Sequence, residues 1–386
     1  MIYLDNAAST KVSDEVVSEM LPYMTALYGN PSSLHRLGRR SEKAVRRGRQ
    51  QISDLIGASP SEILLTSGAT ESNNTAIRGA AILYPGGHII TSAIEHEAVL
   101  EPCARLQSEG YSVSHVPVNQ DGVVDPKDVR ECITSKTFLI SVMLANNEVG
   151  VIQPIQEISK ICKECGVLLH TDAVQAVGKI TVDVDDLGVD MLSISSHKIN
   201  GPKGVGALYV RSGTQISPII FGGGQENEMR SGTENVAGVV GFGKACQLAQ
   251  AQGALRRRHL EHLRNLLVDL VLARIPHTTY NGDRRRRIPD NAHFTFLGVE
   301  GEDLIIKLDE EGIAASTGSA CSTNRQRESH VLRAMGLDHE HVSGSLRLTV
   351  GIGNTEKEIA DTVDVLERVV TQLRSVSPLK TKYDFD

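Results

Sequence analysis

Cysteine is scarce in this chain, which has six in 386 residues and lacks the regular spacing of a disulfide framework. Free thiols in a reducing compartment are therefore expected. Long apolar runs are also missing, since no stretch approaches the roughly 18 uninterrupted apolar residues of a membrane span. The first residues, MIYLDNAAST, reach Asp5 at once and show no basic, apolar leader. These absences predict a cytoplasmic protein with no membrane partner.

Positive charge is not in excess either, because the net charge is −7, and this argues against direct binding of nucleic acid through bulk electrostatics. The basic run at 284–287 is local, and we expect a solvated loop there. Cys162 and Cys165 form a CxxC within PIQEISKICKECG, whose apolar spacing fits an amphipathic helix ending at Gly166. No second ligand pair lies nearby, so we predict no metal site.

The sequence shows no internal repeat, and strand-like and helix-like patterns alternate along most of it. Short runs that are apolar throughout are expected to be strands, with helices between them, at 62–67, 88–92, 137–144, 166–172 and 206–210. Strands that are apolar on both faces predict an α/β fold with a mostly parallel sheet flanked by helices. From about residue 259 a basic helix and further strands predict a smaller α+β domain. We expect residues 13–258 to form the large domain, and 1–12 with 259–386 the small one.

Polar residues gather where these strands end, which is where open α/β sheets bind ligands. Lys198 lies between an apolar segment and a Gly/Pro-rich loop in SISSHKINGPKGVG, as a Schiff-base lysine would, although a solvated lysine is the more common case. Asp172 ends the strand GVLLHTD and could hold a pyridinium nitrogen protonated. An N-cap of a following helix is the alternative for that aspartate.

Two further strand ends complete the pattern. In TSGATESNN, small residues through Ala69 lead into a helix near Thr70, whose N-terminus can bind an anion. His96 follows the strand HIITS and could stack on a ring and move protons, or simply be hydrogen-bonded in a loop. Chance is an improbable source of all four signals at the strand ends of one chain. The four are a phosphate site, a stacking His, a pyridinium partner and a Schiff-base Lys.

The chain resembles the cysteine desulfurases, which are pyridoxal 5′-phosphate (PLP) enzymes of the aspartate-aminotransferase fold type. The similarity runs from YLDNAAST to SLRLTVG near residue 350 and rests on the motifs SHKINGPKG, HTDAVQ, GATESNN, IEHEAV, ANNEVG and RSGTENV. STGSACSTN followed by VLRAMG is similar to the group with a long catalytic loop. The resemblance implies PLP-dependent transferase fold type I, L-cysteine as substrate and a homodimer.

The resemblance also implies roles for matching positions. Lys198 would hold PLP and shuttle the Cα proton, while His96 would stack on the ring and act in acid–base steps. Thr70, Ser195 and His197 would bind the phosphate, together with Thr233 of the partner subunit. Asp172 would pair with the pyridine nitrogen and Gln175 with the ring 3-oxygen. Asn147 would contact the cofactor near the reacting centre, and Ala69 is a further cofactor-binding position. Asn147 and Arg347 would bind the substrate. Arg347 would form a bidentate pair with the substrate carboxylate, and Asn30 would assist it.

Cys321 is the expected nucleophile. Small residues precede it in STGSAC and polar residues follow it, so an exposed loop is favoured over a buried, inert thiol. Gly318 fits a hinge for this loop. The resemblance implies that Cys321 carries the sulfur as a persulfide to an acceptor protein, such as an iron–sulfur scaffold. The tail lacks the His-containing ending with which some relatives dock a scaffold.

Three other functions remain open from the sequence. A selenocysteine lyase would use the same residues, whereas a plain transaminase would have no use for Cys321. A sulfur-relay or scaffold protein without catalysis would not need Lys198, Asp172 and Cys321 together. The acceptor could serve cluster assembly, tRNA thiolation or DNA modification.

Overall fold

The computed structural model describes residues 1–318 and 328–378. Its central feature in these ranges is a seven-stranded sheet in the order β2-β8-β7-β6-β5-β3-β4. The strands are β2 (Ile63–Thr66), β8 (Gly206–Val210), β7 (Met191–Ser195), β6 (Leu168–Asp172), β5 (Thr137–Ser141), β3 (His88–Ser92) and β4 (Ser112–Val116). The strand β8 runs antiparallel to its neighbours β2 and β7, and the other pairs are parallel, so the predicted mostly parallel sheet is confirmed.

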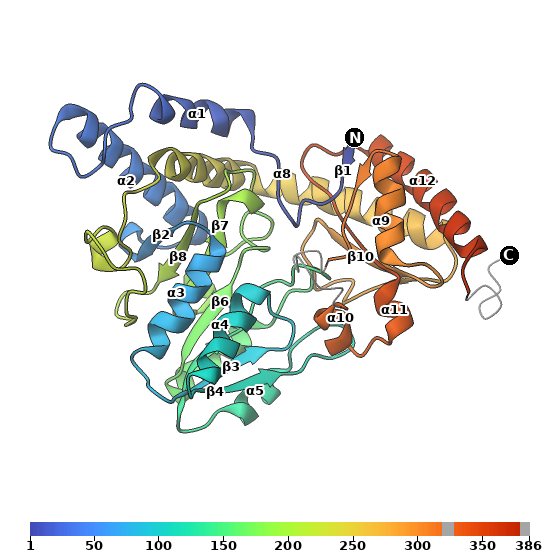
Figure 1. The fold of residues 1–386 in the computed structure, drawn as a ribbon, viewed down its shortest axis with the longest axis horizontal. Coiled ribbons are helices and arrows are strands. Elements are labelled where there is room, and N and C mark those ends of the chain that lie inside the picture. The colour runs from blue at the N-terminus through green and yellow to red at the C-terminus, as the bar shows by residue number, and fades with distance from the viewer. Residues whose placement is uncertain (319–327, 379–386) are drawn as a thin grey trace.

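Helices cover both faces of this sheet (Figure 1). Successive strand residues point to opposite faces: Ile90 and Ile140 join one hydrophobic cluster, while Ile89 and Leu139 join another. The first cluster includes residues of α2 (Arg36–Ile56), α6 (Ile155–Cys165) and α8 (Val236–Arg274), and the other includes residues of α3 (Ala69–Ala81) and α4 (Glu97–Ser108). This two-sided burial explains why the strands are apolar throughout. The remaining helices of this part are α1 (Asp14–Met24), α5 (Pro126–Cys132) and α7 (Val184–Leu187).

The chain after α8 forms a second group of elements together with the N-terminal residues. The antiparallel strands β12 (Ser345–Thr349), β10 (Asn291–Phe296) and β9 (Thr278–Tyr280) form one sheet, and β1 (Ile2–Tyr3) pairs with β11 (Ile313–Ala314). The helices are α9 (Gly301–Glu310), α10 (His330–Ala334), α11 (His339–Ser343) and α12 (Glu356–Ser375). Residues of α8, α9, α12 and these strands form a separate hydrophobic cluster, which also takes in Leu4. We call it the distal cluster and the one containing Ile90 the central cluster.

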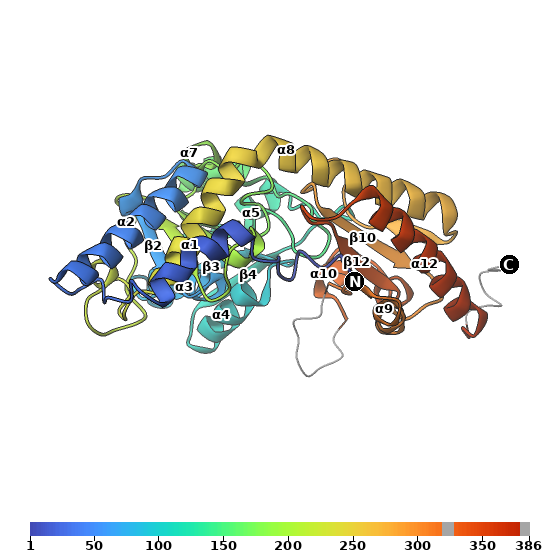
Figure 2. The same ribbon diagram turned by 90° about the horizontal axis from the view of Figure 1, so that it is seen from above.

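The helix α8 joins these two clusters, as both Figure 1 and Figure 2 show. Its residues Val239 and Phe242 lie in the central cluster, whereas Leu263 and Leu267 lie in the distal cluster. The basic helix expected from residue 259 is thus the second half of one 39-residue helix and not an element of its own. We propose that the predicted division into 13–258 and the remainder still separates the two cores, although no chain break or loop marks it.

Some sequence expectations for local structure were wrong. The strands expected at 137–144 and 166–172 are shorter, because β5 ends at Ser141 and β6 begins at Leu168. Arg287 is buried, and its guanidinium lies 4.0 Å from the centre of the Tyr280 ring, so the basic run is only partly a solvated loop. Arg stacks readily on an aromatic face, which compensates for the lost hydration.

One local expectation is confirmed by the CxxC helix. The helix with the CxxC ends at Gly166, which adopts a left-handed conformation with φ of 67°. The five cysteines of the described residues are free, and no group of three or more potential metal ligands occurs among those residues. No helix in residues 1–318 and 328–378 is both long and apolar enough to span a bilayer.

Candidate active site

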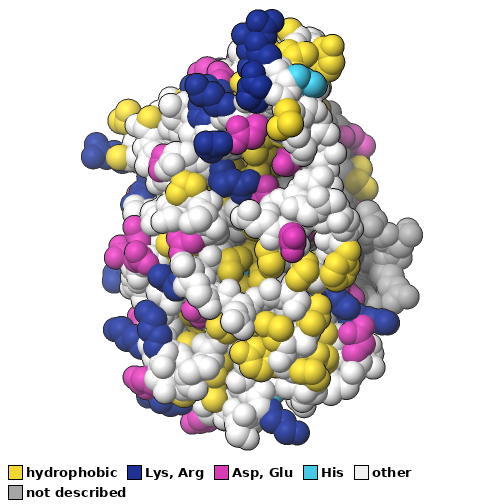
Figure 3. Space-filling view, turned by 90° about the vertical axis from the view of Figure 1, so that its left-hand side faces the viewer, with side chains coloured by type: hydrophobic (Ala, Val, Ile, Leu, Met, Phe, Trp, Pro, Cys, Tyr) yellow, Lys and Arg dark blue, Asp and Glu magenta, His cyan; other side chains and the backbone are white. Residues whose placement is uncertain are grey.

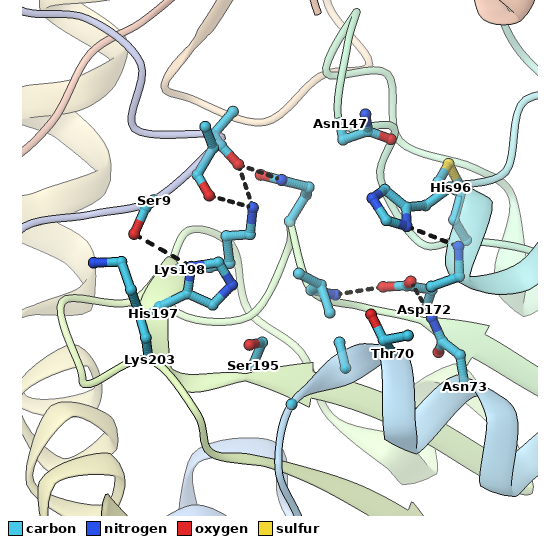
Figure 4. A pocket seen from close by; sticks show the side chains of 18 of the residues that line it. Ser9, Thr70, Asn73, His96, Asn147, Asp172, Ser195, His197, Lys198 and Lys203 are labelled. Carbon is cyan, nitrogen blue, oxygen red and sulfur yellow. Dashed lines mark hydrogen bonds between the residues drawn. The ribbon is translucent and has the colours of Figure 1, made fainter. Parts of the chain in front are cut away.

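A cavity of about 510 Å³ opens at the carboxyl ends of the parallel strands. Its lining includes ten of the predicted site residues: Ala69, Thr70, His96, Asn147, Asp172, Gln175, Ser195, His197, Lys198 and Arg347. They come from different strand ends and from α3 and β12, and Figure 4 shows several of them around one space. The sequence argument that strand-end polar residues share a site therefore agrees with the geometry.

Lys198 belongs to a short 3-10 helix, Ser196–Lys198, directly after β7. Its ammonium donates hydrogen bonds to the carbonyl oxygens of Ala7 and Ala8, the second at 2.9 Å (Figure 4). These carbonyls belong to the N-terminal segment, about 190 positions away in the chain. Two main-chain oxygens thus fix the amine at the wall of the cavity.

Asp172 ends β6 and is buried. Its carboxylate accepts hydrogen bonds from the Asn73 side chain at 2.7 Å and from the Val174 amide at 3.0 Å (Figure 4). The second bond resembles the cap geometry considered from the sequence, but a turn follows and not a helix. No cation forms an ion pair with Asp172 in the described part of the chain, so a protonated ring nitrogen in the cavity would supply its counter-charge.

His96 is the N-cap of α4, and its Nδ1 accepts a hydrogen bond from the Ala98 amide at 3.0 Å. Burial lowers the pKa of His96 and outweighs the nearby Asp172 carboxylate, which raises it; the Lys198 ammonium lowers it further. A neutral imidazole with its proton on Nε2 follows at neutral pH. Such a ring can both stack on a cofactor and donate or receive a proton.

The part of the cavity around Thr70 and Ser195 has the features of a phosphate site. Gly68 precedes α3, and the first turn of this helix presents main-chain N–H groups to the cavity beside Thr70 and Ser195. A Cβ on Gly206 would lie 2.8 Å from the Cα of Gly68, so glycine there lets β8 approach this turn. Burial and the charges of Lys198 and Lys203 lower the pKa of His197 to about 4, which leaves a neutral imidazole.

Arg347 is buried where β12 meets the cavity. One terminal nitrogen pairs with Asp5 at 2.7 Å, and the other donates to the Asn147 carbonyl at 2.9 Å. Its Nε has no hydrogen-bond partner among the described residues. A buried donor without a partner costs free energy, and a substrate carboxylate would satisfy it.

Two predicted residues lie outside this cavity. Asn30 is exposed and accepts a hydrogen bond from the Ser32 amide at 2.9 Å. Thr233 is also exposed, in the segment before α8. Its contribution was predicted to come from a partner subunit and stays a prediction. Cys321 lies outside the described residues, but its flank Gly318 adopts φ of 92°, and a Cβ there would lie 3.2 Å from Glu148.

Sequence reasoning missed several groups of the site. Asn73 follows Thr70 by one helical turn, and this spacing could have revealed it. Glu95 could not have been singled out: it is buried behind His96, and burial and the charge of Asp172 raise its pKa to about 8 against the opposing bonds from Ser92 and Met143. The carbonyls of Ala7 and Ala8 have no side-chain signature at all.

These residues fit the PLP that the resemblance implies. The cavity combines an amine for covalent attachment, a buried carboxylate with no paired cation in the described part of the chain, and a helix N-terminus for the phosphate. We expect Lys198 to bind the cofactor aldehyde, Asp172 its ring nitrogen, and Thr70, Ser195 and His197 its phosphate.

Comparison with known proteins agrees with this geometry. The family described as Aminotransferase class-V matches residues 2–361. A cysteine desulfurase IscS of Dictyoglomus turgidum is 49% identical over 99% of this chain and 98% of its own length. One from Methanosarcina thermophila is 48% identical over 99% and 95% of the two chains. The solved structure of a NifS-like protein superposes with a TM-score of 0.91 at 37% identity, covering 96% of this chain and 99% of that one.

Proposed function

Since the chain belongs to the class-V aminotransferase family and, within it, to the cysteine desulfurases, we propose that it removes sulfur from L-cysteine, releases L-alanine and holds the sulfur as a persulfide on Cys321. The cofactor is PLP. The observation that carries the proposal is one cavity lined by Lys198, the buried Asp172 and Arg347, whose Nε has no hydrogen-bond partner among the described residues. The test is release of alanine and persulfide sulfur from L-cysteine by the purified, PLP-loaded protein.

The chain's own residues would act in a defined order. Arg347 would bind the substrate carboxylate, and the Lys198 amine would remove the Cα proton. When bound, PLP supplies an electron sink for the charge left at Cα. Asp172 keeps the ring nitrogen protonated, and His96 exchanges protons near the reacting atoms.

The sulfur step needs a thiolate. Cys321 as thiolate attacks the substrate sulfur, so that an S–S bond forms and the C–S bond breaks with its electron pair left on carbon. Protonation of that carbon gives alanine. The overall change is cysteine plus protein thiol to alanine plus protein persulfide, and it requires no outside oxidant or reductant.

The acceptor of this sulfur belongs to the same proposal. Relatives named IscS support an iron–sulfur scaffold protein as acceptor, and proteins of tRNA thiolation or DNA modification are the alternatives. Capture of proteins that receive labelled sulfur from the persulfide would distinguish these acceptors. The cytoplasmic location stays a prediction.

We expect Asp172→Ala to lower alanine formation about a hundredfold while PLP content falls much less, because the aspartate stabilises charge on the ring and the phosphate site provides most of the anchoring. Asp172→Asn keeps the shape and is the matched control for packing. PLP released by alkali and alanine production are measured on the same preparations. Equal losses of cofactor and turnover would show that Asp172 is structural only.

We also propose a homodimer with a shared site. Exposed apolar side chains lie on α1 and the segment after it, at Val17, Leu21, Met24, Tyr28 and Leu34. Figure 3 views this end of the molecule, where further apolar side chains reach the surface. A large exposed apolar patch is typical of an interface. Thr233 would then reach the phosphate site of the partner subunit.

The dimer is tested by sedimentation at assay concentration together with Thr233→Ala. We expect a dimer in both cases and a weaker affinity of the Thr233→Ala protein for PLP. A fully active monomer would contradict the shared site.

A further inference from the structure

A buried ion pair lies next to the cavity but outside the residues used so far. The Lys179 ammonium is 2.7 Å from the Asp290 carboxylate, and the two side chains are only 7% and 2% exposed. Lys179 follows the turn after β6, whereas Asp290 directly precedes β10. The pair therefore connects the part of the chain around the central sheet to the part around the distal cluster. Replacing a buried pair by apolar residues is often neutral for stability, so stability alone is a weak explanation for it.

The same ammonium determines the orientation of a cavity residue. Lys179 donates to Oε1 of Gln175 at 3.1 Å, and Nε2 of Gln175 donates to the Ala7 carbonyl at 2.9 Å. A flipped amide would place its NH₂ group against an ammonium and its oxygen against a carbonyl. Both contacts would be repulsive, so the network allows one orientation.

This orientation places an amide nitrogen, with its two N–H donors, on the side of the cavity. Gln175 lines the cavity, and Ala7 takes one N–H. The same Ala7 carbonyl also accepts from the Lys198 ammonium. A continuous series of contacts thus runs from Asp290 through Lys179 and Gln175 to the oxygen that holds Lys198.

We propose that Lys179, held by Asp290, is a positioning residue that presents the Gln175 amide nitrogen to the ring oxygen of PLP. The proposal rests on the proposed function for the presence of PLP and assigns to the buried pair a role in tuning the cofactor. Lys179 does not line the cavity, so it acts only through Gln175. Asp290 keeps the ammonium in place through the ion pair, and its Oδ1 has no hydrogen-bond partner among the described residues.

The test uses the pH dependence of the visible absorbance of the PLP-loaded protein. A hydrogen-bond donor at the ring oxygen stabilises negative charge on that oxygen. It thereby makes the nitrogen that joins Lys198 to the cofactor easier to deprotonate. Removing the donor should raise the pH midpoint by about one unit, which corresponds to one hydrogen bond to a charged group. We expect Lys179→Met and Gln175→Leu to raise the midpoint equally, and the double variant to show no further rise. Titration of the apoprotein with PLP should show weaker binding in both variants.

Arg374→Met is the matched control, because Arg374 is a buried cation that donates to the carbonyls of Leu297 and Pro276 and does not line the cavity. It should lower the melting temperature without moving the midpoint. If Lys179→Met fails to fold, Asp290→Asn, which keeps the side-chain volume, should still raise the midpoint.

A Lys179→Met midpoint equal to that of the wild type would overturn the proposal, whether or not Gln175→Leu shifts it. An additive shift in the double variant would do the same. Failure of the proposed function looks different, because the wild-type protein would then show no visible band with PLP or release no alanine from L-cysteine.

Discussion

Replacing Cys321 by serine should lower persulfide formation from L-cysteine by at least about a thousandfold, since loss of a covalent nucleophile has effects of this size or larger. A serine hydroxyl is not ionised near neutral pH and is a poor nucleophile toward sulfur. PLP binding and exchange of the Cα proton should persist, because they depend on Lys198, Asp172 and Arg347. The measurements are persulfide sulfur, alanine, and incorporation of solvent deuterium at Cα of recovered cysteine.

Cys165→Ser is the control, because Cys165 is an exposed cysteine on α6, far along the chain from the STGSAC motif that contains Cys321. It should keep full persulfide formation. L-selenocysteine extends the experiment, since its weaker C–Se bond can break without a thiol nucleophile. Desulfuration of cysteine by Cys321→Ser within a few-fold of the wild type would exclude Cys321 as the acceptor and leave a generic PLP lyase.

Replacing Lys198 by alanine should abolish the visible absorbance of covalently attached PLP and lower alanine formation by about ten thousandfold. The lysine is both the attachment point and the proton carrier, and removal of a positioned general base costs up to this factor. The Ala8 carbonyl would lose the Lys198 donor and the Ala7 carbonyl would keep only the bond from Gln175, but the phosphate site would still bind PLP noncovalently. Absorbance spectra and stopped assays of alanine measure the two effects.

Lys203→Ala provides the comparison, because Lys203 lines the same cavity beyond Pro202. It should keep the absorbance band of the attached cofactor. A normal band in Lys198→Ala that is lost in Lys203→Ala would transfer the attachment point to Lys203.

The sequence allowed the strand ends of the site to be predicted because their signals are local. A run of apolar residues that stops at Asp172, or at the small residues before Thr70, marks both the end of a buried strand and the polar group placed there. The resemblance then supplied roles for Gln175 and Arg347. Parallel strands end at the same edge of a sheet, so these local signals were sufficient to predict a common site.

Contacts between distant segments were beyond such reasoning. Nothing near Lys198 indicates that the carbonyls of Ala7 and Ala8 hold it, and nothing near Lys179 indicates that Asp290 lies beside it. Main-chain oxygens have the same chemistry at every position, and an ion pair between distant residues leaves no periodic pattern. The continuity of α8 was missed for a related reason, since its apolar residues face two different cores in turn.

That continuity has a consequence for how the protein unfolds. At 1.5 Å per residue, the 39 residues of α8 span about 58 Å. Melting either core would leave half of this helix without its apolar contacts, so the two cores should unfold in a single cooperative transition. A ligand that binds only the native state stabilises the whole cooperative unit. PLP bound at the carboxyl edge of the central sheet should therefore slow hydrogen exchange in α12, which lies in the distal cluster and does not line the cavity.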